Sequence, residues 1–469
     1  MERYYAENEI DKIIDSFSEK AKTYLRNIDA RSVSPTKEAL LNLTKLDVLL
    51  QDSSIDSAIV LQELDSIGSP STIASTGSRY FGFVIGGSVP AALGANLLAG
   101  VWDQNAFSEL SSPVASYIET ICRKWLNTLL GFPPETEIGF VTGATMANFT
   151  ALAAARHSLL KRVGWDVESD GLFGAPPITV FVSNEVHASL LKALSLVGFG
   201  KNRVIRVPTD DQGRMKPELI SAISGPTIVC IQAGNVNTGA FDPADQICEI
   251  AHKKNAWVHV DGAFGLWACT TPERKNLTKG LEKADSWAID AHKWLNVPYD
   301  TGIVFVKDSK SLTGSMSQNA AYLIQGDNRD PINYVPEMSR RARGIEVWAA
   351  LRSLGKNGLI DLINRNCMLA VRFADKLRDA KFQILNDVIL NQVLVSFGEP
   401  ELTNKIIKRV QDDGTCWCGG TVWQNKTAMR ISVSSWRTTE EDIDKSADAI
   451  IRIAIEEISN PFWLRSHSS

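Results

Sequence analysis

The stretch Trp257-Val258-His259-Val260-Asp261-Gly262-Ala263 decides the fold, because it reads as a strand with both faces buried that ends in an acid. Apolar residues fill most of it, as is typical of a central strand of a parallel sheet. The small residues after Asp261 leave room for a ligand at the carboxyl end of the strand, where open α/β sheets bind their ligands. A second run of this kind, Ser286-Trp287-Ala288-Ile289-Asp290-Ala291-His292-Lys293-Trp294, also ends in polar residues.

Five further runs of strand character flank these two, and helical stretches separate them along about residues 138–310. These runs are Ile138–Val141, Ile178–Val182, Arg203–Val207, Thr227–Gln232 and Gly302–Val306. Strands that alternate with crossover helices predict a parallel sheet covered on both faces. We therefore expect an α/β fold with a mainly parallel seven-stranded sheet.

The rest of the chain predicts two further units around a large domain of residues 71–338. Residues 1–70 have apolar residues at helical spacing, and we expect either a lid on the large domain or an arm that clasps a second subunit. A long helix beginning near Ser339, followed by the strands Gln392–Phe397 and Met429–Val433, predicts a smaller C-terminal α+β domain of residues 339–469.

Composition and charge narrow the function classes. The 469 residues are 44% hydrophobic with a net charge of -5, and they contain no basic block of the kind that binds nucleic acid or a membrane surface. The start lacks the order of a secretory signal, and the apolar stretch Val89–Trp102 is too short to span a bilayer. Seven scattered cysteines favour a reducing, cytoplasmic location, and the isolated Cys416-Trp417-Cys418 predicts no metal site.

The turn Gly139-Phe140-Val141-Thr142-Gly143-Ala144-Thr145-Met146-Ala147-Asn148 joins a predicted strand to a helix. Small residues at such a junction let backbone NH groups and the helix N-terminus face an anion, and Thr145 adds a hydroxyl donor. The alternative is a plain helix cap. A phosphate group would fit the first interpretation.

Three more polar residues lie at predicted strand ends. His187, in Glu185-Val186-His187, is able to stack on a flat cofactor or to cap a helix. Asp261 is able to pair with a pyridinium nitrogen or to cap a helix, and Lys293, in apolar surroundings, is able to attack an aldehyde or to remain a solvated lysine. Their common position at one edge of one sheet favours a pyridoxal phosphate site.

At these motifs the chain resembles the group II pyridoxal-phosphate-dependent decarboxylases, which include aromatic amino acid, glutamate and cysteine-sulfinate decarboxylases. The resemblance covers about residues 75–455. The motifs that carry it are Thr142–Thr145, Glu185–His187, Asn235–Pro243, His259–Ala263 and Asp290–Trp294. It implies fold type I, pyridoxal 5'-phosphate as cofactor, and a homodimer whose active sites lie at the subunit interface.

The resemblance also implies roles for individual residues. Lys293 would bind the aldehyde of the cofactor, Asp261 its ring nitrogen, and His187 the face of its ring, while Arg430 and Asn235 would contact the substrate. The predicted cofactor-binding residues are Gly143, Ala144, Thr145, His187, Asp261, Ala263, Asp290, His292 and Lys293. Some relatives have an asparagine at the position of Asp290, and an anion there is expected to weaken phosphate binding unless another group hydrogen-bonds it.

The predicted reaction is decarboxylation of an L-amino acid to an amine and carbon dioxide. In the family a loop tyrosine that reaches into the partner's site is associated with protonation of Cα, and of Tyr322 and Tyr334 we expect Tyr334 to have this role. The segment Tyr80–Gly87 lacks the bulky aromatic residues of aromatic decarboxylases, so the sequence does not name the amino acid. The alternatives are an aldehyde synthase or aminotransferase on the same scaffold, and a non-catalytic binding protein.

Overall fold

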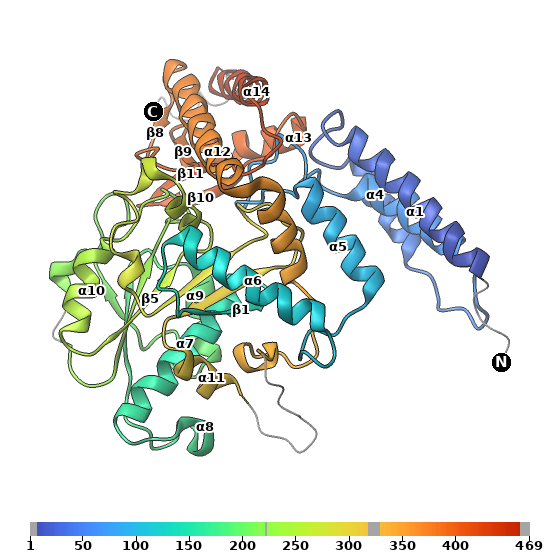
Figure 1. The fold of residues 1–469 in the computed structure, drawn as a ribbon. Coiled ribbons are helices and arrows are strands. Elements are labelled where there is room, and N and C mark those ends of the chain that lie inside the picture. The colour runs from blue at the N-terminus through green and yellow to red at the C-terminus, as the bar shows by residue number, and fades with distance from the viewer. Residues whose placement is uncertain (1–6, 221–222, 318–328, 460–469) are drawn as a thin grey trace.

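A seven-stranded sheet forms the centre of the protein in the computed structural model, which describes residues 7–220, 223–317 and 329–459 (Figure 1). The strand order is β1-β7-β6-β5-β4-β2-β3, and only β7 runs antiparallel to its neighbours. The strands are β1 (Glu137–Val141), β2 (Thr179–Ser183), β3 (Ile205–Val207), β4 (Thr227–Gln232), β5 (Trp257–Asp261), β6 (Ser286–Asp290) and β7 (Gly302–Val306). The predicted α/β fold with a mainly parallel sheet is confirmed.

Helices cover both faces of this sheet, and alternate side chains of each strand point to opposite faces. One face packs against α7 (Ala144–Arg162), α9 (Ala188–Leu196) and α11 (Ser309–Met316). The other face packs against α6 (Pro113–Leu130), α10 (Ala244–His252) and the first part of α12 (Gly344–Asp379). Burial on both sides explains why the strand sequences are almost continuously apolar.

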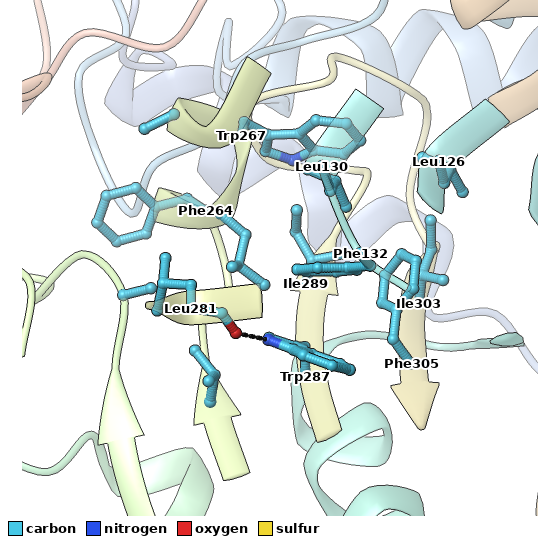
Figure 2. Packing of buried hydrophobic residues seen from close by; sticks show 14 of the residues in the cluster. Leu126, Leu130, Phe132, Phe264, Trp267, Leu281, Trp287, Ile289, Ile303 and Phe305 are labelled. Atoms are coloured by element: carbon cyan, nitrogen blue, oxygen red, sulfur yellow. Dashed lines mark hydrogen bonds between the residues drawn. The ribbon is translucent and has the colours of Figure 1, made fainter. Parts of the chain in front are cut away.

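Aromatic side chains form a dense layer beneath β6, on the face opposite α7 (Figure 2). Trp287 stacks on Phe132 with ring centroids 4.2 Å apart, and Phe305 meets the same Phe132 ring edge-on. The Trp287 Nε1–H donates to the Leu281 carbonyl oxygen at 2.7 Å, so its polar atom is satisfied. Each buried side chain of this size contributes roughly 1.5–3 kcal/mol, and the layer holds the strand that ends at Asp290.

A second, antiparallel sheet with the order β10-β11-β9-β8 forms the smaller C-terminal unit. Its elements are β8 (Gln383–Ile384), β9 (Gln392–Ser396), α13 (Pro400–Asp413), β10 (Gly419–Trp423), β11 (Lys426–Ser432) and α14 (Glu440–Ile458). The helix α12 begins five residues later than the expected Ser339, at Gly344, and is kinked at Gly355. Its residues before the kink pack on the large sheet and those from Leu369 onward on the small one, whereas the predicted boundary at residue 339 stays a prediction.

The N-terminal helices extend from one side of the molecule (Figure 1). They are α1 (Glu7–Asn27), α2 (Lys37–Asn42), α3 (Ser57–Glu63) and α4 (Ser69–Ser71), followed by α5 (Pro90–Trp102). Several apolar side chains of this N-terminal segment are exposed: Leu41 on α2, and Val48, Leu49 and Leu50 in the loop before α3, of which the last two are 95% and 92% exposed. Among the described residues, no helix is both long and apolar enough to cross a membrane.

Short elements complete the chain: α8 (Val167–Asp170), a π-helical turn (Leu64–Gly68) and several 3-10 turns. The 3-10 turns are Leu43–Leu46, Pro217–Leu219, Gly265–Thr270, Pro272–Arg274, Leu281–Lys283 and Pro331–Tyr334.

Candidate active site

A pocket lies at the carboxyl ends of the central strands, where parallel α/β sheets bind ligands. It brings together His187, Asp261, Ala263 and Lys293, which the sequence analysis placed in one site. Residues that the sequence analysis did not select also line it: Gln232, Gly234, Val236 and Phe264. Gln232 ends β4 in the same way that Asp261 ends β5, and this repeated position was the signal for it.

Asp261 is buried at the end of β5, with only 6% of its surface exposed. Its Oδ1 accepts from the Ala263 backbone NH at 3.3 Å and its Oδ2 from the Asn148 Nδ2 at 3.3 Å. Desolvation by burial raises the pKa of Asp261, while the charges of His187 and Lys293 and these two hydrogen bonds oppose the rise. The carboxylate therefore faces the pocket that His187 and Lys293 also line.

Lys293 follows β6 and reaches the same pocket, but its surroundings differ from the expectation. The sequence predicted an amine in apolar surroundings, whereas the structure places the Nζ atom 2.9 Å from the Oδ2 of buried Asp290. This ion pair compensates the charge of the amine, which burial alone would disfavour. The environment of the Lys293 amine is therefore set by this ion pair and not by apolar surroundings alone.

The turn before α7 contains the predicted phosphate cradle. Asp290 Oδ1 accepts from the Ala144 NH at 2.6 Å, so a protein carboxylate already meets the first NH group of the helix. The next two NH groups, of Thr145 and Met146, meet no acceptor within the described residues. The helix N-terminus thus still offers donors to an anion, beside a carboxylate that competes for one of them.

His292 lies next to this turn. Its Nδ1 accepts from the Thr301 NH at 3.0 Å, and its Nε2 lies 3.4 Å from Asp290 Oδ1. The ring of Tyr299 stacks on it, with centroids 4.2 Å apart. Desolvation by burial lowers the pKa of His292 and raises that of Tyr299. Tyr299 was not predicted from the sequence, although it follows the His292-Lys293 pair closely along the chain.

His187 has the capping role, one of the two that the sequence left open, and its stacking on a cofactor stays a prediction. Its Nδ1 accepts from the Ser189 NH at 3.2 Å and caps α9, while the ring lines the pocket. Its pKa lies below the ordinary value, chiefly because the surrounding protein desolvates the imidazolium, although Asp261 opposes this effect. Capping holds the ring against the pocket without preventing contact with a ligand.

Arg430 lies on β11 of the small sheet and is near enough to His187 to lower the pKa of that imidazole. Its guanidinium has no acidic partner among the described residues, and its Nη1 donates to the Asn237 Oδ1 at 3.4 Å. Asn235, the other predicted substrate ligand, is buried and uses its side-chain oxygen to accept from the backbone NH groups of Asn237 and Thr238. Its role in substrate binding stays a prediction, and Asn237 is the residue that faces Arg430.

The two candidate tyrosines differ in what the structure shows. Tyr322 lies outside the described residues. Tyr334 is partly buried beside β1, with the Arg329 guanidinium 3.5 Å above its ring, and desolvation raises its pKa. Its predicted role as a proton donor stays a prediction.

These residues fit pyridoxal phosphate. Asp261 matches a ring nitrogen, the Lys293 amine an aldehyde, and the free NH groups of α7 a phosphate. Only the Asp290 carboxylate opposes the fit, because it lies where negative charge is expected to bind.

Comparisons with known proteins agree with this site. Residues 45–398 match the model of the pyridoxal-dependent decarboxylase conserved domain. Tryptophan decarboxylase 1 from Oryza sativa subsp. japonica is 26% identical over 96% of this chain and 94% of its own length. An acidic amino acid decarboxylase from Bos taurus is 28% identical over 86% of this chain and 83% of its own length. The crystal structure of Oryza sativa TDC with PLP and tryptamine superposes with a TM-score of 0.89 at 23% identity, covering 98% of this chain and all of that one.

Proposed function

Because this chain belongs to the pyridoxal-dependent decarboxylase family, we propose that the pocket between Lys293, Asp261 and His187 binds the cofactor and presents an amino acid to it. The chain is a pyridoxal phosphate-dependent amino acid decarboxylase, a lyase that converts an L-amino acid into an amine and carbon dioxide. When bound, pyridoxal phosphate supplies an aldehyde that links to amines and a protonated ring that withdraws electrons from Cα.

Each pocket residue has a proposed task in holding the cofactor. Lys293 contributes the amine, and Asp261 holds a proton at the ring nitrogen, because its carboxylate is the anion at that end of the pocket. His187 covers one face of the ring, and Ala263 leaves space on the other. The NH groups of Thr145 and Met146, with the Thr145 hydroxyl and His292, bind the phosphate.

The proposal for how the substrate binds rests on Arg430. A guanidinium that is largely desolvated and has no acidic partner among the described residues requires an anion, and the α-carboxylate of an amino acid meets this requirement. A carboxylate fixed by Arg430 would have one direction in the pocket. With the cofactor bound, that direction would favour loss of carbon dioxide over other reactions of the amino acid.

The test is product analysis of the purified enzyme with added pyridoxal phosphate across the L-amino acids, acidic and aromatic ones first. We expect carbon dioxide and the matching amine in equal amounts, with neither hydrogen peroxide nor ammonia. Aldehyde and ammonia as the main products would overturn decarboxylation in favour of an aldehyde synthase. A requirement for a keto acid would indicate an aminotransferase.

We further propose a homodimer joined through the N-terminal helices. The exposed side chains of Leu41, Val48, Leu49 and Leu50 are too apolar to be stable in water as a group, and a second copy of the chain would cover them. Sedimentation of the wild type should give a dimer, and Leu49→Glu with Leu50→Glu should shift it toward the monomer. A monomeric wild type would contradict the proposal.

A cytoplasmic location also remains a proposal. It is supported by all seven cysteines being free thiols, six of them buried. Unpaired cysteines in these numbers are typical of a reducing compartment.

A further inference from the structure

We propose that a buried chain of hydrogen bonds from Trp257 to Asp261 fixes the charge and orientation of the Asp261 carboxylate. This inference rests on the proposed function of Asp261 and deepens it. It makes Asn148 and His259 positioning residues, which act on the cofactor only through Asp261.

The chain has four links. The Trp257 Nε1 lies 2.8 Å from the Ser286 Oγ, and that oxygen lies 2.9 Å from the His259 Nδ1. The His259 Nε2 lies 2.8 Å from the Asn148 Oδ1, and the Asn148 Nδ2 lies 3.3 Å from the Asp261 Oδ2. We name these five side chains the Asp261 relay.

The chemistry of its ends sets the direction of every link. The ionised Asp261 carboxylate is able only to accept, so the Asn148 NH2 faces it and the Asn148 oxygen accepts from the His259 Nε2–H. A neutral imidazole with its proton on Nε2 accepts at Nδ1, so the Ser286 hydroxyl donates to it. The Ser286 oxygen in turn accepts from the indole NH of Trp257. All four bonds donate toward the carboxylate, which is thereby held as an acceptor.

Burial of these side chains fixes the donor and acceptor directions of the four hydrogen bonds. Asn148, His259 and Ser286 are fully buried and Trp257 is 2% exposed, so water is not available to replace a lost partner. Burial lowers the pKa of His259 to about 3, which keeps the ring neutral in the physiological range. A reversed link would leave two donors or two acceptors facing each other in the interior, which is costly.

The relay also explains why Asp261 is approached from the protein side by an amide and not by a cation. A cation there would neutralise the carboxylate and compete with the ring nitrogen for it. The Asn148 NH2 stabilises the ionised form and fixes its rotation, but leaves the negative charge available to the pocket. Donors of this kind around a functional carboxylate or ligand typically change activity about 10- to 100-fold when removed.

The first experiment uses the cofactor-free protein, so its outcome does not depend on the proposed reaction. Nitrogen-15 NMR of histidine-labelled protein, with His259 assigned by its loss in His259→Gln, should show a neutral ring protonated at Nε2 between about pH 5 and 8. A ring protonated at Nδ1, or a doubly protonated ring, would overturn the relay.

The second experiment separates positioning from simple packing. Asn148→Leu keeps the volume but removes the donor, and we expect kcat to fall about 10- to 100-fold with KM for the amino acid nearly unchanged. Asn148→Gln, which retains the amide, should recover part of kcat. Thr150→Val is the matched control, because Thr150 is equally buried on α7 but its hydroxyl donates to the Met146 carbonyl of its own helix.

Circular dichroism and cofactor absorbance would verify that the variants are folded and loaded. An Asn148→Leu enzyme with the kcat of the control would overturn the positioning role even if the NMR result holds. If instead the wild type binds no pyridoxal phosphate, the proposed function fails, while the NMR measurement still tests the hydrogen-bond chain.

Discussion

Replacing Asp290 by asparagine should strengthen the binding of phosphate. In the structure the Asp290 Oδ1 accepts from the Ala144 NH at 2.6 Å, and its Oδ2 pairs with the Lys293 Nζ at 2.9 Å. The carboxylate thus occupies the first NH group of the helix, beside the NH groups that are expected to bind the phosphate, and its negative charge repels an anion there. The asparagine keeps the shape of the side chain and removes its negative charge.

The magnitude follows from the strength of the competing bond. A hydrogen bond to a charged acceptor contributes about 1.5–3 kcal/mol, and one to a neutral acceptor about 1 kcal/mol. Asp290→Asn should therefore return about 0.5–2 kcal/mol to the phosphate, which corresponds to roughly 2- to 30-fold tighter binding. The loss of negative charge beside the helix N-terminus acts in the same direction, because the side chain no longer repels the anion.

Fluorescence titration of the cofactor-free protein would measure this effect with pyridoxal phosphate, pyridoxal and inorganic phosphate. Only the two phosphate-containing ligands should gain affinity. Asp285→Asn is the matched control, because Asp285 lies at the other end of β6, where it accepts from the Val258 NH. Weaker phosphate binding in Asp290→Asn, or an equal gain for pyridoxal, would refute the reasoning.

Four further predictions concern the remaining polar residues. Lys293→Ala should abolish the visible absorbance of the bound cofactor, and Asp261→Asn should retain the cofactor but lose most of kcat; full activity in the second variant would contradict its role. Arg430→Leu should raise KM for the amino acid about 10- to 100-fold with an unchanged cofactor Kd, measured by carbon dioxide release and by titration. His259 titrates near 6.5 when unfolded and at about 3 when folded, so its stabilising effect is present above about pH 6.5 and is lost as pH falls toward 3. Urea unfolding between these pH values should therefore show a steeper loss of stability in the wild type than in His259→Asn.

The large sheet was predictable because burial on both faces leaves a plain signal in the sequence. The seven predicted runs agree with the strands to within two residues at each end. The strands β8 and β10 of the small sheet were not predicted, because they are partly exposed and lack a continuous apolar run. β10 is a half-exposed edge strand that begins with two glycines, and its sequence therefore resembles a loop.

The pocket residues were predictable for a related reason. Parallel strands place their carboxyl ends at one edge of the sheet, so polar residues that follow separate strands converge without any need to know the helices between them. His187, Asp261 and Lys293 satisfy this condition, and the structure brings them together. Arg430 required the resemblance, because it comes from the other sheet and no rule of strand order places it near the pocket.

What the sequence could not predict is how the buried polar groups are paired. Whether Asp290 weakens or supports phosphate binding depends on the Ala144 NH, which is far away along the chain, and on a distance of 2.6 Å that no spacing rule predicts. The Asp261 relay depends on the same kind of information, since Asn148 lies on α7 while His259 and Ser286 lie on adjacent strands. An apolar core tolerates small errors in packing, but a buried donor must meet an acceptor at one position. The pairing of the buried groups around Asp261 and Asp290 is therefore set by tertiary contacts, some of them from side chains that have no catalytic signature of their own.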